Sequence, residues 1–252
     1  MADELPLKLR REPIVDAVCE IRFNASTPLH AVLPGVFYSK LPGVGNIESL
    51  PMAGLPIEIR RQNPLLVDLP LVRLLWGAYF VSIGERALSV AVKLPYPGWA
   101  TFKQDIVTIA SMTMQAKLAT SVERYSIRYT NLLEIEQLAD QIEAVNWSVQ
   151  VGPFTARNEA VHVRLEASDG AFKTLLNVAV GTQVQLVTGV AKNGLLVDVD
   201  TVRECSEEVA SFEAALSDRL EEIRQHNKRV FFACLKPATI ALLEPVYAND
   251  LH

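Results

Sequence analysis

The segment IVDAVCEIRF at residues 14–23 decides the fold, because its apolar and polar residues alternate. The odd-numbered residues from Ala17 to Phe23 are all apolar, whereas Glu20 and Arg22 lie between them. Successive side chains of a strand point to opposite faces, so the pattern predicts a strand with one buried and one polar face. Such half-buried strands are typical of antiparallel sheets that pack one face on a core.

Similar patterns recur along the chain, and glycine-containing turns separate several of them. Further strands are predicted at residues 57–61, 71–83, 87–94, 121–131, 148–151, 160–166, 172–180, 184–188 and 195–200. Turns are predicted at Gly84-Glu85-Arg86, Ser168-Asp169-Gly170 and Lys192-Asn193-Gly194, because glycine, aspartate and asparagine tolerate positive φ. Residues 41–56 are rich in proline and glycine and are predicted to be a loop.

Four segments are predicted to be helical, namely residues 28–40, 99–119, 134–144 and 206–235. The two long helices each have an apolar stripe at helical spacing, which includes Phe102 and Ile106 in the first and Phe212 and Leu216 in the second. Near the end of the last helix, Lys228, Arg229 and Lys236 suit the negative pole of the helix dipole.

The order of these elements predicts an α+β fold with an antiparallel sheet, or sheets, packed under two long helices. Residues 1–133 and 134–252 form two halves of the same plan, each with strands followed by one long helix. The pattern leaves open whether the halves are a duplication. Because no glycine- or serine-rich linker lies near residues 132–136, the halves are predicted to share one core.

The composition excludes several classes of protein. The chain has 252 residues, of which 50% are hydrophobic and 21% charged, and its net charge is −5. Disordered chains lack this much apolar surface, and binders of nucleic acid normally have a basic excess. The sequence has no long uncharged apolar window, so we predict no membrane span, and its three separated cysteines predict free thiols in the cytoplasm.

Single arginines on predicted strand faces are the first candidate binding groups. Arg22 shares a face with Glu20, Arg124 and Arg128 share another, and Arg60 alternates with Ile59 in residues 57–61. Arginine on a rigid strand is suited to bidentate recognition of carboxylate or phosphate. The same pattern is also typical of a solvated sheet face with cross-strand ion pairs, and both interpretations stay open here.

Two polar and aromatic groups could line a binding site. Tyr129 and Asn131 adjoin Arg128 at the end of a predicted strand, where sites often form, although they could equally anchor the core and turn the chain. Trp99 lies with Tyr96 and Phe102 at the start of a helix. That cluster could clamp a ligand or partner, or it could be a hydrophobic staple.

No assembled catalytic set is visible in the sequence. The four histidines lack metal-ligand spacing, and no nucleotide-binding or nucleophile motif is present, so no metal or cofactor is predicted. Cys205 precedes a predicted helix, where a thiol pKa can be lowered, but it has no assignable histidine partner. Asp198 and Asp200 share a strand face and could act as an acid and base or as solvated residues.

Residues 12–23 resemble the N-terminal signature of a sporadically distributed, uncharacterised bacterial and archaeal protein family. That signature reads Pro-Pro-Ile-Val-Glu-Ala-Val and then Glu-Ile-Arg-Phe, and the chain departs from it at Glu12 and Asp16. Further similar segments are Gly98-Trp99 with Phe102, Arg124 with residues 128–131, and residues 197–200. The resemblance carries no catalytic residue; the family's patchy distribution implies an accessory role, for example in a defence or toxin–antitoxin-like cassette.

Together these patterns predict a cytoplasmic, non-enzymatic binding protein. It is expected to hold a protein partner or a small anionic ligand on a sheet face or groove, and to form a homodimer that covers an open sheet edge. The alternative is an enzyme whose pocket is lined by Arg124, Arg128, Tyr129 and Asn131. The acidic balance disfavours nucleic acid, although a local basic stripe along the arginines would permit it.

Overall fold

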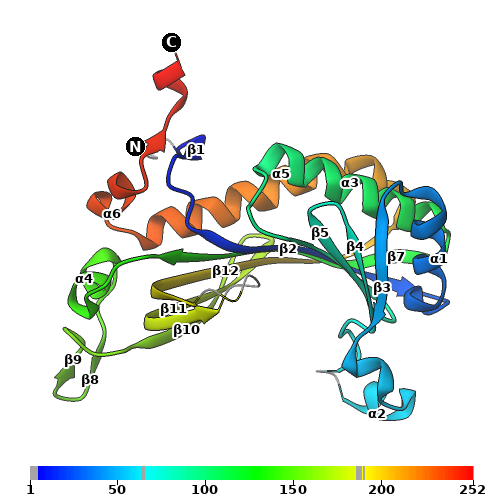
Figure 1. Cartoon of the computed structure of the whole chain (residues 1–252), viewed down its shortest axis with the longest axis horizontal. Helices are drawn as coiled ribbons and strands as arrows, with labels where there is room; N and C mark the ends of the chain where they lie inside the picture. The colour runs from blue at the N-terminus through cyan, green and yellow to red at the C-terminus, as the bar shows by residue number, and fades with distance from the viewer. Residues whose placement is uncertain (1–4, 64–65, 186–188, 190, 252) are drawn as a thin grey trace. The chain divides into compact units, whose positions relative to one another are not determined.

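A computed structural model describes residues 5–63, 66–185, 189 and 191–251 (Figure 1). The strands are β1 (Lys8–Leu9), β2 (Ile14–Ala25), β3 (Val44–Ser49), β4 (Val72–Trp76), β5 (Tyr79–Ile83), β6 (Ala87–Val92), β7 (Ala119–Leu133), β8 (Gln150–Val151), β9 (Phe154–Thr155), β10 (His162–Asp169), β11 (Phe172–Gln185), β12 (Ala191–Glu208) and β13 (Pro245–Val246). The helices are α1 (Leu29–Lys40), α2 (Ile57–Gln62), α3 (Trp99–Gln115), α4 (Leu138–Ala144), α5 (Val209–Cys234) and α6 (Pro237–Leu242), with short 3₁₀ turns at Pro51–Gly54 and Ala248–Leu251.

Nine strands form one sheet in the order β10-β11-β12-β7-β2-β6-β5-β4-β3. The pairs β10–β11, β2–β6, β3–β4, β4–β5 and β5–β6 are all antiparallel. The predicted α+β fold, with an antiparallel sheet packed against helices, is therefore confirmed. The two longest described helices are α3, with 17 residues, and α5, with 26 residues.

The chain divides into two compact units, and each unit is made of stretches that are not contiguous in the sequence. Unit 1 comprises Met1–Val15, Arg128–Thr201 and Arg224–His252, and unit 2 comprises Asp16–Ile127 and Val202–Ile223. The unit boundaries fall inside β2, β7, β12 and α5, so each of these elements has residues in both units.

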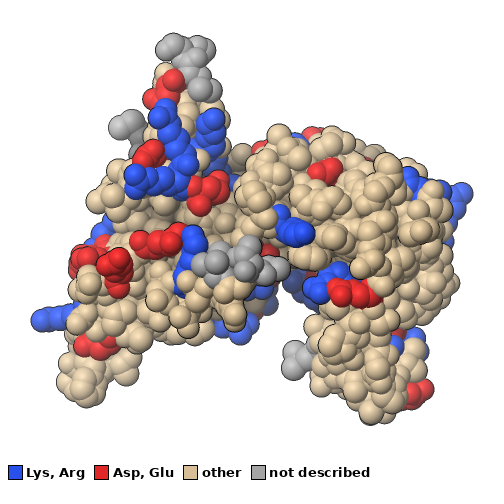
Figure 2. All heavy atoms as spheres, in the orientation of Figure 1, with Lys and Arg blue, Asp and Glu red and all other residues tan. Residues whose placement is uncertain are grey.

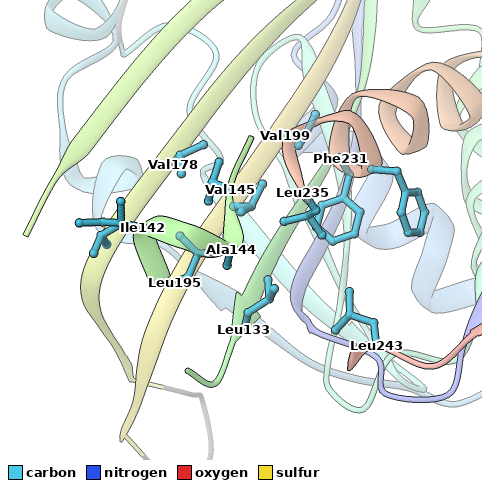
Figure 3. Close-up of a cluster of buried hydrophobic side chains, with 13 residues drawn as sticks. Leu133, Ile142, Ala144, Val145, Val178, Leu195, Val199, Phe231, Leu235 and Leu243 are labelled. Carbon is cyan, nitrogen blue, oxygen red and sulfur yellow. The ribbon is translucent and has the colours of Figure 1, made fainter. Parts of the chain in front are cut away.

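The core of unit 1 is an apolar cluster built from strands and helix ends (Figure 3). Val178 and Val199 come from β11 and β12, Ile142 comes from α4, and Phe231 and Leu235 come from the end of α5. A backbone hydrogen bond joins the segment after α4 to the end of α5, since the Asn146 N–H donates to the Cys234 carbonyl at 2.7 Å. Burying each large aliphatic or aromatic side chain contributes roughly 1.5–3 kcal/mol, so this cluster is what fixes the end of α5 on the sheet.

Unit 2 buries aromatic side chains between its strands and helices. The ring of Tyr79 in β5 stacks on Phe102 of α3 with centroids 5.9 Å apart. Tyr125 of β7 packs edge-on against Phe212 of α5 at 5.3 Å. Phe102 and Phe212 are both fully buried, as expected for the apolar stripes of the two long helices. These stripes are therefore where α3 and α5 pack against the strands of this unit.

Several sequence predictions differ from the structure at their boundaries. The first long helix ends at Gln115 rather than 119, and β12 continues to Glu208, so the last helix begins three residues later than predicted. The predicted strand at 71–83 is a hairpin, because Gly77 adopts φ +55° between β4 and β5. The predicted strand at 184–188 falls partly outside the described residues.

Three local predictions are wrong. Residues 57–61 belong to helix α2, so Arg60 is not on a strand face. Residues 41–56 contain β3 and a 3₁₀ turn rather than only a loop. The predicted turn at Lys192-Asn193-Gly194 lies inside β12, where a Cβ on Gly194 would come 2.2 Å from the carbonyl oxygen of Leu133. Gly194 is thus required by close backbone approach rather than by a turn.

Candidate functional site

Asp198 of β12 is the centre of a polar cluster in unit 1. Its carboxylate accepts hydrogen bonds from Arg128 Nε at 2.7 Å and Arg128 Nη2 at 2.9 Å, which form a bidentate pair. Thr130 Oγ1 and Asn177 Nδ2 donate to the same carboxylate, each at 3.0 Å. Asp198 is only 3% exposed, and a buried carboxylate is stable only when donors of this kind surround it.

Within this cluster, the guanidinium of Arg128 binds a carboxylate of its own chain. Two of its nitrogens bind Asp198, so the planar fork that would recognise an external carboxylate or phosphate is engaged within the chain. Its side chain is 48% exposed, in contrast to the buried carboxylate of Asp198. The geometry is that of a cross-strand ion pair between β7 and β12.

Tyr129 and Asn131 alternate with Arg128 and Thr130 on β7, so they point to the opposite face. The Tyr129 ring is 2% exposed and lies 4.5 Å beneath the guanidinium of Arg224 from α5. Asn131 is also buried and donates to the carbonyl of Val197 at 3.2 Å. The structure thus divides the polar group at residues 128–131 between two faces of the sheet, because neighbouring residues of a strand point in opposite directions.

The other predicted site residues, Arg22, Arg124 and Trp99, belong to unit 2. Arg22 binds Glu20 through Nε and Asp68 through Nη1, both at 2.7 Å. Burial opposes the charge of Arg22, but the two carboxylates outweigh it and raise the pKa of the guanidinium. Like Arg128, Arg22 is therefore bound by carboxylates of its own chain.

Arg124 and Trp99 occupy different surroundings within unit 2. Arg124 is half-buried on β7. The indole N–H of Trp99, the first residue of α3, donates to Glu221 of α5 at 2.8 Å, and its ring packs edge-on against Phe102 at 6.4 Å. Because Gly98 is the residue that caps α3, Trp99 and Phe102 both lie in the first turn of the helix, and their contact is not the contact across the cap that defines a hydrophobic staple.

The cysteines and the buried histidine do not form a nucleophilic set. Burial, together with Glu207, raises the pKa of Cys205 to about 11, so the lowered thiol pKa considered from its position is wrong. Burial also raises the pKa of Cys234 to about 11. His226 is buried against Phe172 and lies 3.3 Å from Thr174 Oγ1. Within the described part of the chain, no three histidine, cysteine, aspartate or glutamate side chains are grouped to hold a metal.

A pocket of about 660 Å³ lies in unit 1, beside the end of α5 and along α6. Its lining includes Phe232, which also belongs to the buried apolar cluster of unit 1. The lining residues are Leu5, Pro6, Arg229, Phe232, Ala233, Pro237, Ile240, Ala241, Pro245 and Tyr247. This size and this mostly apolar lining are typical of small-molecule sites in proteins.

Arg229 is the charged side chain of this pocket. It is exposed, and among the described residues no carboxylate pairs with it, in contrast to Arg22 and Arg128. Tyr247 adds a phenol to the lining. The pocket therefore combines an apolar wall with one available guanidinium, a pattern suited to a ligand that has an apolar body and one negative charge.

Further basic side chains surround β1 in the same unit. Lys8, Arg10 and Arg11 follow one another on the N-terminal segment, and Figure 2 shows lysine and arginine side chains gathered in this area. Arg11 pairs with Glu244 at 2.8 Å, while Lys8 and Arg10 are exposed. The surface around β1 therefore carries charges of both signs.

The sequence alone does not predict this pocket. Its pattern indicates Arg229 only as one of several basic residues at the end of a helix. The lining comes from two regions far apart along the chain, residues 5–6 and residues 229–247. The short pairing of β1 with β13, with Lys8 opposite Val246, brings the two ends of the chain together. No local pattern reveals such pairing.

Neither a protein-family model nor a curated protein matches the chain. The resemblance of residues 12–23 to the sporadically distributed family therefore stays a prediction. Among the helices of the described residues, none is both long and apolar enough to cross a membrane.

Proposed function

We propose that the chain is a non-enzymatic binding protein whose pocket beside α5 and α6 holds a small carboxylate with an apolar body. The observation that supports this proposal is the placement of Arg229 in an otherwise apolar pocket of about 660 Å³, with no carboxylate partner among the described residues. Arg22 and Arg128, the strand arginines expected to bind an anion, are instead engaged by Asp68 and Asp198.

The chemistry of the lining favours binding over catalysis. Arg229 and Tyr247 are its titratable side chains, and the described lining has no carboxylate, histidine, thiol, or serine or threonine hydroxyl that could act with the Tyr247 phenol. General acid–base or nucleophilic catalysis needs such a group within hydrogen-bond reach of the reacting atom. A guanidinium beside an apolar wall supplies recognition without a reaction.

Calorimetric titration with decanoate tests this proposal. We expect saturable binding by the full chain, and weaker binding of the uncharged analogue decanol. Replacing Arg229→Ala removes one charge-assisted interaction and is expected to lower the affinity for decanoate about tenfold or more.

A matched pair of substitutions on α6 separates the pocket from the rest of the surface. Ala241 lines the pocket, whereas Ala238, three residues away on the same short helix, is exposed and does not line it. Ala241→Trp should fill the pocket and abolish binding, while Ala238→Trp should leave it unchanged. The proposal fails if the wild-type chain does not bind decanoate, or if Arg229→Ala and Ala241→Trp bind it as well as the wild type.

A further inference from the structure

β10 is the terminal strand of the nine-stranded sheet, and one of its edges is open. Among the described residues it pairs only with β11, beside which it lies in Figure 1. Seven of its eight residues are exposed, and its register with β11 is continuous from His162–Ala179 to Asp169–Phe172. A regular strand of this length presents a row of unpaired backbone groups, which another strand can bind.

The register identifies which backbone groups face the open edge. The Val180 N–H donates to the Val161 carbonyl at 2.8 Å, and this pair continues the β10–β11 register by one step. In an antiparallel pair, alternate residues point their N–H and C=O groups toward the partner strand. The odd-numbered residues of β10 therefore bond to β11. The backbone groups of the even-numbered residues, His162 to Ser168, face the open edge.

A second copy could add its own β10 antiparallel about a twofold axis, and the charges distinguish the possible registers. Only the even-numbered residues have backbone groups free to bond across the open edge, so an even-numbered residue must pair with an even-numbered residue of the second copy. In the three registers nearest the middle of β10, the twofold axis passes residue 164, 165 or 166, and that residue lies opposite its own counterpart. Centring on 164 places Arg164 opposite its counterpart, and centring on 166 places Glu166 opposite its counterpart. Centring on Leu165 instead places Arg164 opposite Glu166 twice, once on each side of the axis, which is the favourable arrangement.

The apolar face of β10 agrees with the same register. Leu165 is 55% exposed, although Leu176 opposite it on β11 packs against the buried cluster of unit 1. The core side of the sheet thus continues onto β10 without being covered there. In the register centred on Leu165, each Leu165 meets its counterpart, and Val163 meets Ala167.

We infer that β10 pairs with β10 of a second copy in this register, so that the sheet continues from one chain to the other. The interface is isologous, as a closed twofold dimer requires. Arg164 and Glu166 lie two residues apart on the same strand, so antiparallel pairing with an identical strand in this register places each of them opposite a residue of opposite charge. Ser168, at the hairpin turn of one copy, would meet His162 of the other, which lines a hollow of about 780 Å³ next to the exposed Phe154.

Sedimentation equilibrium over a concentration series tests the interface in the full chain. The wild type should be a dimer in reversible equilibrium with its monomer. Arg164→Glu replaces two opposite-charge pairs with two like-charge pairs and should raise the Kd of self-association about tenfold or more. Glu166→Arg should do the same, although it also removes the ion pair of Glu166 with Lys173 in its own chain.

The most specific test of the register mixes the Arg164→Glu variant with the Glu166→Arg variant. A chain with Arg164→Glu carries two acids at positions 164 and 166, and a chain with Glu166→Arg carries two bases. In the inferred register each acid faces a base, so the mixture should form a heterodimer although each variant alone associates weakly. The double exchange, Arg164→Glu with Glu166→Arg, should restore self-association.

Arg10→Glu provides the matched control, because Arg10 is exposed on the segment after β1 and outside β10. It should leave self-association unchanged. A wild-type chain that stays monomeric overturns the inference. So does a dimer that Arg164→Glu leaves intact, or a mixture of the two variants that does not associate. Circular dichroism of each variant establishes that a loss of association is not a loss of folding.

Discussion

The two strands at the ends of the sheet, β3 and β10, differ in how they present their edges. β3 shifts register against β4 between Val44 and Ile47, so it has one more residue there than its partner strand. β10 has no such irregularity. Glu48 of β3 is paired with Arg73 on β4, and Glu166 of β10 is likewise paired with Lys173 on β11, but only β10 also carries a base, Arg164, at the neighbouring outward-bonding position.

Exposure alone does not make a docking edge. Both strands are exposed over most of their length, and each carries an exposed apolar side chain, 44% for Ile47 and 55% for Leu165. A bulge interrupts the row of backbone donors and acceptors and increases the local twist, which discourages a further strand. The regular, self-complementary edge of β10 lacks this protection.

Proline substitutions on β10 give the largest expected effect on folding. Leu165 directs its N–H toward β11, so Leu165→Pro removes a ladder hydrogen bond and leaves the Leu176 carbonyl without its donor, which should lower the free energy of unfolding by about 1–3 kcal/mol. Arg164 directs its N–H outward, so Arg164→Pro should leave the unfolding free energy nearly unchanged while weakening self-association. Urea denaturation and sedimentation measure the two effects. Equal destabilisation by both prolines would contradict the assigned strand orientation.

Lysine substitutions compare the two edges directly. Leu165→Lys places two like charges at the centre of the inferred interface and should raise the Kd of self-association about tenfold. Ile47→Lys makes the same chemical change on β3 and should leave the Kd unchanged. Sedimentation of the two variants is the measurement, and weaker association of Ile47→Lys would place the interface on the other edge.

Acidification should weaken the anchoring of the β10–β11 hairpin to α5. His226 packs against Phe172 and Thr174 of β11, and burial, reinforced by Arg229, lowers its pKa below 6.5. The unfolded chain therefore binds the proton more readily. The stability contributed by neutral His226 is present above pH 6.5 and is lost as the pH falls through the lowered pKa.

Thermal or urea unfolding between about pH 7 and about pH 5 measures this loss. His226→Gln should reduce the pH dependence, because it removes the titrating group. His30 has a pKa lowered by burial as well, so His30→Gln serves as the control that retains the contribution of His226. If the wild type and His226→Gln lose stability in parallel, the role assigned to His226 is wrong.

The smallest expected effect is at the ion pair of β3. Glu48→Arg breaks the exposed pair with Arg73 and places two bases opposite each other. Because exposed pairs contribute little, the unfolding free energy should fall by less than about 1 kcal/mol. The association state should not change, in contrast to Glu166→Arg on β10. A loss of association after Glu48→Arg would show that β3 also takes part in assembly.

Alternation and helical periodicity were enough to predict most of the fold. The strand at residues 14–23 corresponds to β2, and the two long helices correspond to α3 and α5. The turn at residues 168–170 is confirmed, since Gly170 adopts φ +57° between β10 and β11. These predictions succeeded because local side-chain patterns record which face of an element is buried.

The same local rules gave wrong results where distant contacts decide the conformation. Gly194 satisfies the composition of a turn, yet close approach to Leu133 makes it part of a strand. Residues 57–61 alternate like a strand but form α2, in which Arg60 Nη2 binds Glu85 at 3.0 Å. Neither contact is visible in the sequence near the residue concerned.

The sequence by itself determined the elements, their polar and apolar faces, and the absence of recognisable catalytic motifs. Only the tertiary structure decided which arginines are available: Arg128 is engaged by Asp198, 70 residues away, whereas Arg229 has no such carboxylate partner among the described residues. It also decided that residues 5–6 line one pocket with residues of α5, α6 and β13, and that β10 is an edge strand. The physical reason is that periodicity records burial along one element, while charge pairing, pockets and edges depend on contacts between elements distant in sequence.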